Sequence, residues 1–463
     1  MAQAWELCEA LMEGTAEMRS EGKKYLPQWP AEENEAYRAR LATAVLFPAF
    51  SRTVETLAGK PFSKALTLSE DMPEDVRTWC ADIDREGRNL QSFAGDCMTA
   101  ALAYGLGGIL VEYPDASKVP TNAAGVRTME DERRAGLRPY FVHIEAEQIL
   151  GWRVKKGRIL MLRLMECVEE DDGEFGTKDV EQVRVLTPGA WQVWRIPADK
   201  QDWKDAVIHD QGVTTLDFVP FVPYYGKRTG FMTARPPLME VAHLNVAHWQ
   251  SASDQQTILH AARVPILFLK NLGDMVDDTG KKREVVIGAS SAIQGNTPDA
   301  DAKFVEHSGA AIAAGRTDLQ DLEERMRQAG AELLVIKPGQ VTATQTGVEN
   351  AVAMCALQRI TLDLQDALNL ALHHLAAWVK MPTAGTVTLF NDFGVGSLAE
   401  ASAELLLKAN TAGKLSDETF RDELRRRGVL SGAVDEATEV SRLEGQGPAG
   451  GLGDPTGGGG GGA

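Results

Sequence analysis

Two short acidic pairs are the first candidates for chemistry. The string DLQD places Asp318 three residues before Asp321, and it recurs as Asp363 and Asp366. On a helix this spacing puts both carboxylates on one face, where they could bind a cation or act as an acid and a base. A solvated helix face explains the same spacing, and we favour that interpretation. Because Asp318 follows a threonine that can cap a helix, we expect the first pair in a first helical turn.

The histidines and cysteines do not form a recognisable site. His243 and His248 are five residues apart, and His373 and His374 are adjacent. Two metal ligands on one helix face need a spacing of three or four, so we expect structural roles for these histidines and no metal. The cysteines are odd in number, widely spaced and without a CxxC pair, which predicts free thiols in a reducing compartment. They are Cys8, Cys80, Cys97, Cys167 and Cys355.

Two basic clusters could bind a partner. Lys281, Lys282 and Arg283 follow one another in a turn-rich segment and could dock an acidic protein, although a solvated turn is the simpler reading. Residues 404–428 have the spacing of a helix-turn-helix, with arginines 425–427 placed to contact phosphates. Acidic residues share that helix, so a small packing module fits better.

Motifs for catalysis are absent from the sequence. It contains no phosphate-binding GxxxxGK[ST] loop, no GxGxxG after a strand, and no HExxH, GxSxG or EF-hand string. We therefore predict a protein that is not an enzyme and needs no cofactor.

Composition narrows the class of protein. The 463 residues are 44% hydrophobic and 25% charged, which excludes a collagen-like or wholly disordered chain. Forty-eight Lys and Arg against 66 Asp and Glu give a formal charge of −18, which argues against a protein that grips DNA through a basic surface. An acidic surface would instead let DNA pass without sticking. The sequence has no signal peptide and no apolar run of 18 residues, so we expect a soluble protein.

The first half mixes helices with a β-rich region. Residues 33–58 read as a helix broken at Pro48, and 87–106 as a helix that ends at Gly107-Gly108 before a strand at 109–113. Five β-branched and aromatic runs with turn residues between them predict an antiparallel meander, followed by a Pro-rich link. The five runs are 140–144, 149–154, 159–168, 180–186 and 191–196.

The second half predicts two helices around a small β-insert. A polar helix opens near Pro236 and Pro237, and the insert's strands include 266–269 and 303–306. The second helix is predicted to open with Thr317 as N-cap and Gln320 at N3, a capping box. A loop over 334–347 leads to a long helix over 348–380 whose apolar positions recur every three or four residues, a face we expect to pack on the meander and the 87–106 helix.

Several strings resemble the portal proteins of tailed double-stranded DNA phages. YLPQWPAEENEAYRARLATAVLFPAFSRTVETLAGKPF resembles the start of a portal-like, uncharacterised-domain family found in phage genomes. DFVPFVPYYG and RPPLMEVAHLNVAHWQSASDQQTILHAARVPILFL resemble the entry into a first stem helix and a clip. TATQTGVENA and AGKLSDETFRDELRRRGVL resemble the turn into the long helix and the C-terminal helices. The order of parts is also that of a portal.

The resemblance implies an α+β portal-type fold with defined segments. They are a wing over 1–235, a first stem helix over 236–262, a clip over 263–311, a second stem helix over 312–333, a tunnel loop over 334–347, a long helix and return to the wing over 348–400, crown helices over 401–444, and a disordered Gly-rich tail over 445–463.

The resemblance also implies function and partners. A ring, usually of twelve subunits, would occupy one vertex of the virion's capsid after assembly in the host cytoplasm, with no membrane involved. Double-stranded DNA would pass through it, and the terminase large subunit, a head–tail adaptor, the major capsid protein and scaffold would bind it. The clip residues Lys281, Lys282 and Arg283 would contact adaptor or terminase. The tunnel-loop residues facing DNA would be Lys337, Gln340, Thr342, Thr344 and Gln345.

Two alternatives stay open at this point. A phage-encoded nuclease or peptidase with dispersed catalytic residues would need a nucleophile or metal set that the motifs do not supply. Another minor head protein, such as an adaptor, would usually be much shorter than 463 residues.

Overall fold

The computed structural model describes residues 2–114, 136–173, 175–263, 266–270, 301–305, 309–335 and 354–393, together with residue 299 and a few residues between 407 and 420. The fold class is α+β, as the sequence predicts. The chain divides into two compact units, Met1–Asn391 and Asp392–Ala463. Almost all of the predicted crown helices and Gly-rich tail lie outside the described residues. None of the helices in the described ranges is long and apolar enough to span a membrane.

The N-terminal part is helical, and its break falls where Pro48 predicts it. Between α3 and α4, residues 44–48 leave the helical conformation because proline cannot donate the backbone hydrogen bond that would continue the helix. Helix α4 then buries Phe50, Val54 and Leu57. The helices are α1 (Ala2–Glu13), α2 (Thr15–Ser20), α3 (Asn34–Thr43), α4 (Ala49–Gly59), α5 (Glu74–Trp79) and α6 (Leu90–Ala103).

A three-stranded antiparallel sheet with the order β3-β2-β9 lies at the centre of this unit. Its strands are β2 (Leu106–Glu112), β3 (Tyr140–Ile144) and β9 (Phe221–Tyr225). The prediction that a helix ends at Gly107-Gly108 was wrong, because both glycines lie inside β2. A Cβ atom at Gly107 would lie 2.1 Å from Tyr224 Oη, and one at Gly108 would lie 2.0 Å from the Phe221 ring. The glycines therefore let aromatic side chains of the neighbouring strand cross β2.

A second sheet has five strands and contains four of the five strands predicted for the antiparallel meander. Its order is β4-β5-β6-β7-β8, with all neighbours antiparallel. Run 140–144 was wrongly placed in it, since that run is β3 of the other sheet, and β8 was not predicted. The strands are β4 (Ile149–Lys155), β5 (Arg158–Asp172), β6 (Gly176–Thr187), β7 (Ala190–Arg195) and β8 (Val207–Val213), with a short 3-10 helix at Trp203–Asp205 before β8.

The long helix α10 (Ala356–Trp378) covers the three-stranded sheet. It packs on β9, β2 and α6, and Trp378 Nε1 donates to the Val111 carbonyl at 2.9 Å. Its predicted apolar face is confirmed, since Leu357, Leu364 and Leu375 are buried. Two details differ from the prediction. Residues 354 and 355 were predicted to be helical but precede α10, and Cys355 is its N-cap. The helix packs mainly on the three-stranded sheet rather than on the meander.

The segment predicted as a link also contains strands. Besides β9 it forms the hairpin of β10 (Lys227–Gly230) and β11 (Thr233–Arg235), which leads directly into α8. Strand β1 (Thr67–Leu68) pairs with β14 (Val387–Thr388). The strand predicted at 386–390 is therefore present but shorter.

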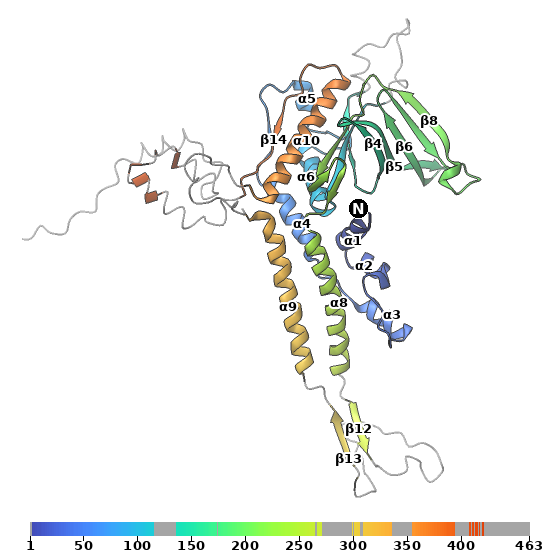
Figure 1. Cartoon of the computed structure of the whole chain (residues 1–463), viewed down its shortest axis with the longest axis vertical. Coiled ribbons are helices and arrows are strands. Elements are labelled where there is room, and N and C mark those ends of the chain that lie inside the picture. The colour runs from blue at the N-terminus through green and yellow to red at the C-terminus, as the bar shows by residue number, and fades with distance from the viewer. Residues whose placement is uncertain are drawn as a thin grey trace, which may run out of the picture. The chain divides into compact units, whose positions relative to one another are not determined.

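Two long helices and a hairpin complete the unit. Helix α8 (Met239–Ala262) is followed by β12 (Ile266–Lys270), β13 (Asp301–Val305) and α9 (Ala310–Ala331), which a short 3-10 turn extends to Leu334. Strands β12 and β13 pair antiparallel with Ile266 opposite Val305. Helices α8 and α9 run side by side (Figure 1). The predicted capping box was wrong, because α9 begins at Ala310 and Thr317 lies inside the helix. The Thr317 Oγ1 donates to the Ala313 carbonyl at 3.1 Å instead of capping the helix.

Candidate functional site

The α8–α9 helix pair occupies the residues that the sequence resemblance assigns to two stem helices. The β12–β13 hairpin connects the two helices, so the chain leaves the sheets through α8, turns in the hairpin and returns through α9 (Figure 1). The pair carries six acidic residues and three arginines, all three of them on α9. This composition gives the helix pair a negative surface.

Polar side chains join the two helices along their length. Ser251 Oγ donates to Asp318 Oδ2 at 2.6 Å, and Gln255 Nε2 donates to the Ile312 carbonyl at 2.9 Å. Asp318 of the first DLQD pair therefore serves a helix–helix contact. The pattern explains why α8 is polar for its length, because its polar residues pack against polar neighbours.

His248 and Glu323 form a third link between the helices. His248 Nε2 lies 3.7 Å from Glu323 Oε1, and His248 is buried. Burial lowers the pKa of His248 below its usual value, and the opposing effect of Glu323 is smaller. The imidazole is therefore neutral at pH 7, and the contact is a polar one rather than a strong ion pair.

Small residues let α9 approach its neighbours closely. A Cβ atom at Gly315 would lie 2.0 Å from Gln255 Oε1, and one at Gly330 would lie 2.9 Å from Thr53 Cγ2 of α4. A larger side chain at 315 would displace the Gln255 amide from the Ile312 carbonyl. Gly315 thus sets the spacing of the helix pair.

The base of α8 is fixed by buried polar contacts to the N-terminal helices. Asn245, fully buried, accepts from the Phe50 amide at 2.9 Å and donates to the Phe47 carbonyl at 2.8 Å. The Phe50 amide lies in the first turn of α4, where it has no helical acceptor, and the Phe47 carbonyl lies in the break before α4, where it also accepts from the Ala49 amide at 2.8 Å. One side chain therefore satisfies both and ties α8 to α4.

A buried ion pair joins Arg40 of α3 to Glu32, which precedes α3, and lies against α8. Arg40 Nε and Nη2 donate to the two Glu32 oxygens at 2.7 and 2.8 Å, and both side chains are almost fully buried. The bonds from Arg40 lower the pKa of Glu32. Arg40 also lies 3.8 Å from Asp254 of α8. The pair holds the N-terminal helices against α8.

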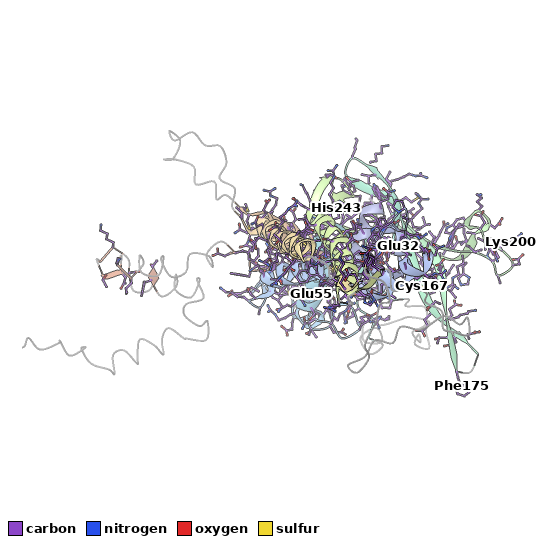
Figure 2. All side chains as sticks on the ribbon, turned by 90° about the horizontal axis from the view of Figure 1, so that it is seen from below. Glu32, Glu55, Cys167, Phe175, Lys200 and His243 are labelled. Carbon is purple, nitrogen blue, oxygen red and sulfur yellow. The ribbon has the colours of Figure 1, made fainter. Side chains whose placement is uncertain are left out.

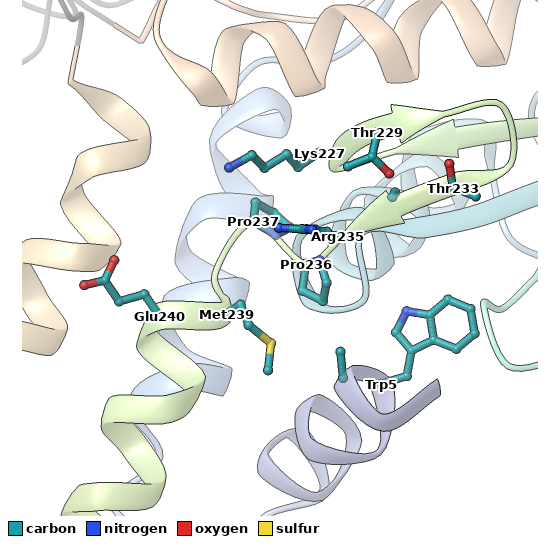
Figure 3. Close-up of a pocket in the computed structure, with 11 residues that line it drawn as sticks. Trp5, Lys227, Thr229, Thr233, Arg235, Pro236, Pro237, Met239 and Glu240 are labelled. Carbon is teal, nitrogen blue, oxygen red and sulfur yellow. The ribbon is translucent and has the colours of Figure 1, made fainter. Parts of the chain in front are cut away.

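A pocket of about 640 Å³ lies where the sheets pass into α8 (Figure 3). Trp5 of α1, Lys227 of β10 and Glu240 of α8 are among its lining residues. Thr229, Thr233 and Arg235 also line it.

The predicted chemical candidates do not form a catalytic or metal site in the described part of the chain. No group of three His, Cys, Asp or Glu residues there could hold a metal ion. Burial and then the neighbouring Asp366 raise the pKa of Asp363 on α10. His374 packs on Phe218 with ring centroids 4.6 Å apart, and burial followed by His373 lowers its pKa to about 4. His374 is therefore a structural, neutral histidine.

The cysteines are free thiols, as the sequence predicts. Burial raises the pKa of Cys8 to about 12 and that of Cys80 to about 11, so neither is reactive at neutral pH. Cys167 on β5 is exposed.

The residues predicted for partner and DNA contact lie outside the described ranges. They are Lys281, Lys282 and Arg283 for the partner, and Lys337, Gln340, Thr342, Thr344 and Gln345 for DNA. The sequence did not predict the contacts of Asn245 with Phe47 and Phe50, or of Arg40 with Asp254, because these partners are distant in the chain. The only signal was the high polarity of α8.

Comparisons with known proteins match parts of this arrangement. The profile of a domain of unknown function (DUF4055) matches residues 237–379, from the start of α8 to the end of α10. No curated protein matches the sequence significantly.

Three solved structures of gene transfer agent (GTA) particles are similar at low identity. The neck of the native particle with C12 symmetry has 14% identity over 85% of this chain and 93% of that chain, with a TM-score of 0.42. The neck of the empty particle with C6 symmetry has 12% identity over 82% and 90%, with a TM-score of 0.41. The native virion has 12% identity over 82% and 88%, with a TM-score of 0.38. Because these TM-scores lie below 0.5, function has to be inferred from the chain's own residues.

Proposed function

We propose that this chain is a phage portal protein, which forms a ring of about twelve copies at one capsid vertex and passes DNA through its centre. The observation that carries the proposal is the α8–hairpin–α9 excursion, followed by α10 packed back on the sheet. This is the order of stem helix, clip, stem helix and long helix that the sequence resemblance implies. The family profile over 237–379 spans the same elements.

The stem chemistry suits a channel for DNA. Helix α9 exposes Asp321 and Glu324, and its Arg327 is paired with Glu323 at 3.6 Å and with Glu324 at 2.5 Å. Acidic walls repel phosphates, so DNA would slide rather than bind. The carboxylates of Glu323 and Glu324 beside Arg327 weaken its attraction for a phosphate.

Two segments would act on partners and DNA. The clip, residues 263–311, would dock terminase during packaging and the head–tail adaptor afterwards, through Lys281, Lys282 and Arg283. The tunnel loop, residues 334–347, would bring Lys337 to the DNA. One positive charge per subunit is a weak contact that a ring repeats around the duplex.

A charge reversal in the tunnel loop tests the DNA channel. Lys337→Glu should leave ring assembly intact and lower the fraction of DNA-filled heads by roughly half or more, because each subunit then repels a phosphate instead of attracting it. The fraction is measured in a packaging reaction with the phage's own proheads and terminase.

Lys200→Glu is the matched control, because Lys200 is an exposed lysine in the loop after β7 (Figure 2). It should package like the unmodified protein. Equal yields from both variants would remove Lys337 from the mechanism. Proheads that package DNA without this chain would contradict the portal proposal itself.

A further inference from the structure

The β5–β6 hairpin extends beyond its sheet as an arm. Strand β4 pairs with β5 only as far as Leu164, and β7 pairs with β6 only from Val183. The pairing of β5 with β6 continues to Asp172 opposite Gly176. We call residues 167–181 the arm. No other described strand flanks it, and Phe175 lies at its far end (Figure 2).

The arm has an apolar tip and an acidic face. Phe175 is 95% exposed. Residues 167–181 contain seven acidic residues and one lysine. The register places Glu169 directly opposite Asp179. On the other face, Glu170 lies opposite Lys178 and pairs with Arg195 at 2.5 Å. The like charges of the Glu169–Asp179 face have no such partner among the described residues, so a cationic surface laid against that face would stabilise it.

The complementary surface lies on the broad part of the same sheet. A groove of about 630 Å³ is lined by apolar side chains and by two arginines, Arg153 of β4 and Arg163 of β5. Both arginines are exposed, and neither has an ion-pair partner among the described residues. We call the apolar residues of this lining the floor of the groove. They are Leu150, Met161, Met165, Val183, Val185, Trp194 and Trp203.

The arm and the groove belong to the same two strands. Met161 and Met165 come from β5, and Val183 and Val185 from β6, so the strands that form the floor run on into the arm. A continuous strand pair cannot fold back onto its own face without breaking its ladder. The arm therefore cannot fill the groove of its own chain, whereas the arm of a second copy has the apolar tip and the acidic face that suit it.

We propose that the arm of each copy docks into the sheet groove of the next copy. Phe175 would enter the apolar floor, and the acidic face would lie against Arg153 and Arg163. Two different surfaces on each subunit make a head-to-tail contact, which closes into a ring when the rotation permits. The inference rests on the proposed ring and names one of its subunit contacts.

Photo-cross-linking from the tip of the arm tests the contact. We would replace Phe175 with p-benzoylphenylalanine in the full chain, irradiate the assembled protein, and map the cross-linked peptide by mass spectrometry. The expected product has the mass of two chains, twice 50.2 kDa, and joins residue 175 to the floor of the groove around Val183 or Trp194.

Charge variants make the test specific. Arg153→Glu combined with Arg163→Glu should lower the yield of this product at least about fivefold, because the acidic face then meets like charge. Lys155→Glu is the control, an exposed lysine on the same sheet outside the groove, and should change little. Glu169→Lys with Asp171→Lys should restore the yield in the arginine-reversed protein.

The outcomes separate this contact from the ring itself. A ring whose residue 175 cross-links elsewhere, or not at all, overturns the arm contact and leaves the portal proposal in place. A wild-type protein that forms no assembly overturns both.

Discussion

At the residue scale, buried polar side chains satisfy backbone groups that the helices leave open. Asn245 shows this most clearly, because one amide serves both the Phe47 carbonyl and the Phe50 amide at the Pro48 break. The sequence predicts the break from the proline alone. It cannot predict the partner, because nearly two hundred residues separate Asn245 from Phe50 and no local pattern links them.

His374 gives a prediction of how stability depends on pH. Its pKa is about 4 in the folded protein, against 6.5 for a free histidine side chain. The unfolded chain therefore binds a proton between these values that the folded protein does not, and stability is lost as pH falls through this range. Between pH 7 and 5 the loss from this residue is about 2 kcal/mol.

The measurement compares unfolding free energies from urea titrations at pH 7 and pH 5. His374→Phe should reduce the drop seen in the unmodified protein, since phenylalanine can keep the contact with Phe218 and has no proton to bind. His373→Phe, at an exposed neighbouring position, should keep the drop. An identical drop in His374→Phe would show that His374 is not held neutral by burial.

At the element scale, the long periodic patterns gave correct predictions, and the capping and turn signals gave several wrong ones. The apolar repeat on α10 predicts its buried face because about six turns of consistent spacing leave little ambiguity. Thr317 resembles an N-cap, yet α9 begins earlier, at Ala310, since its Ala-rich first turns are good helix formers without a cap. The four residues Thr317 to Gln320 match a capping box, but the helix-forming residues before them extend the helix past this point.

Glycine was misread for a similar reason. Gly107-Gly108 looks like a helix stop, whereas the structure uses both for the close approach of Tyr224 and Phe221. This role depends on β9, which lies more than a hundred residues later in the chain. Strands β8 to β11 were missed because their short, Pro- and Gly-containing segments carry no clear alternation.

The packing of α10 is testable by truncating one side chain. Leu364 is 1% exposed, so Leu364→Ala should lower the free energy of unfolding by roughly 2–5 kcal/mol, through lost burial and the cavity it leaves. Leu370 lies on the same helix and is 47% exposed, so Leu370→Ala should cost less than about 1 kcal/mol. Both values come from urea denaturation. Equal effects of the two substitutions would mean that the helix faces the sheet with a different side.

At the scale of the whole molecule, the acidic charge and the order of elements were readable from the sequence. The charge of −18 follows from composition, and the helix pair around a hairpin follows from periodicity and turn residues. The docking surfaces were not readable. The groove on the five-stranded sheet depends on which strands are neighbours and on which face each residue lies, and both are set by tertiary pairing.

The central claim is that copies of this chain form a ring with an open channel. Electron microscopy of the purified native protein, with class averages of single particles, tests it most directly. We predict rings of about twelve copies, close to 600 kDa for a chain of 50.2 kDa, with a central hole in the end view. The measurement is made at the concentrations where the protein is assembled with capsid and scaffold. Monomers, dimers or closed particles without a hole would contradict the account.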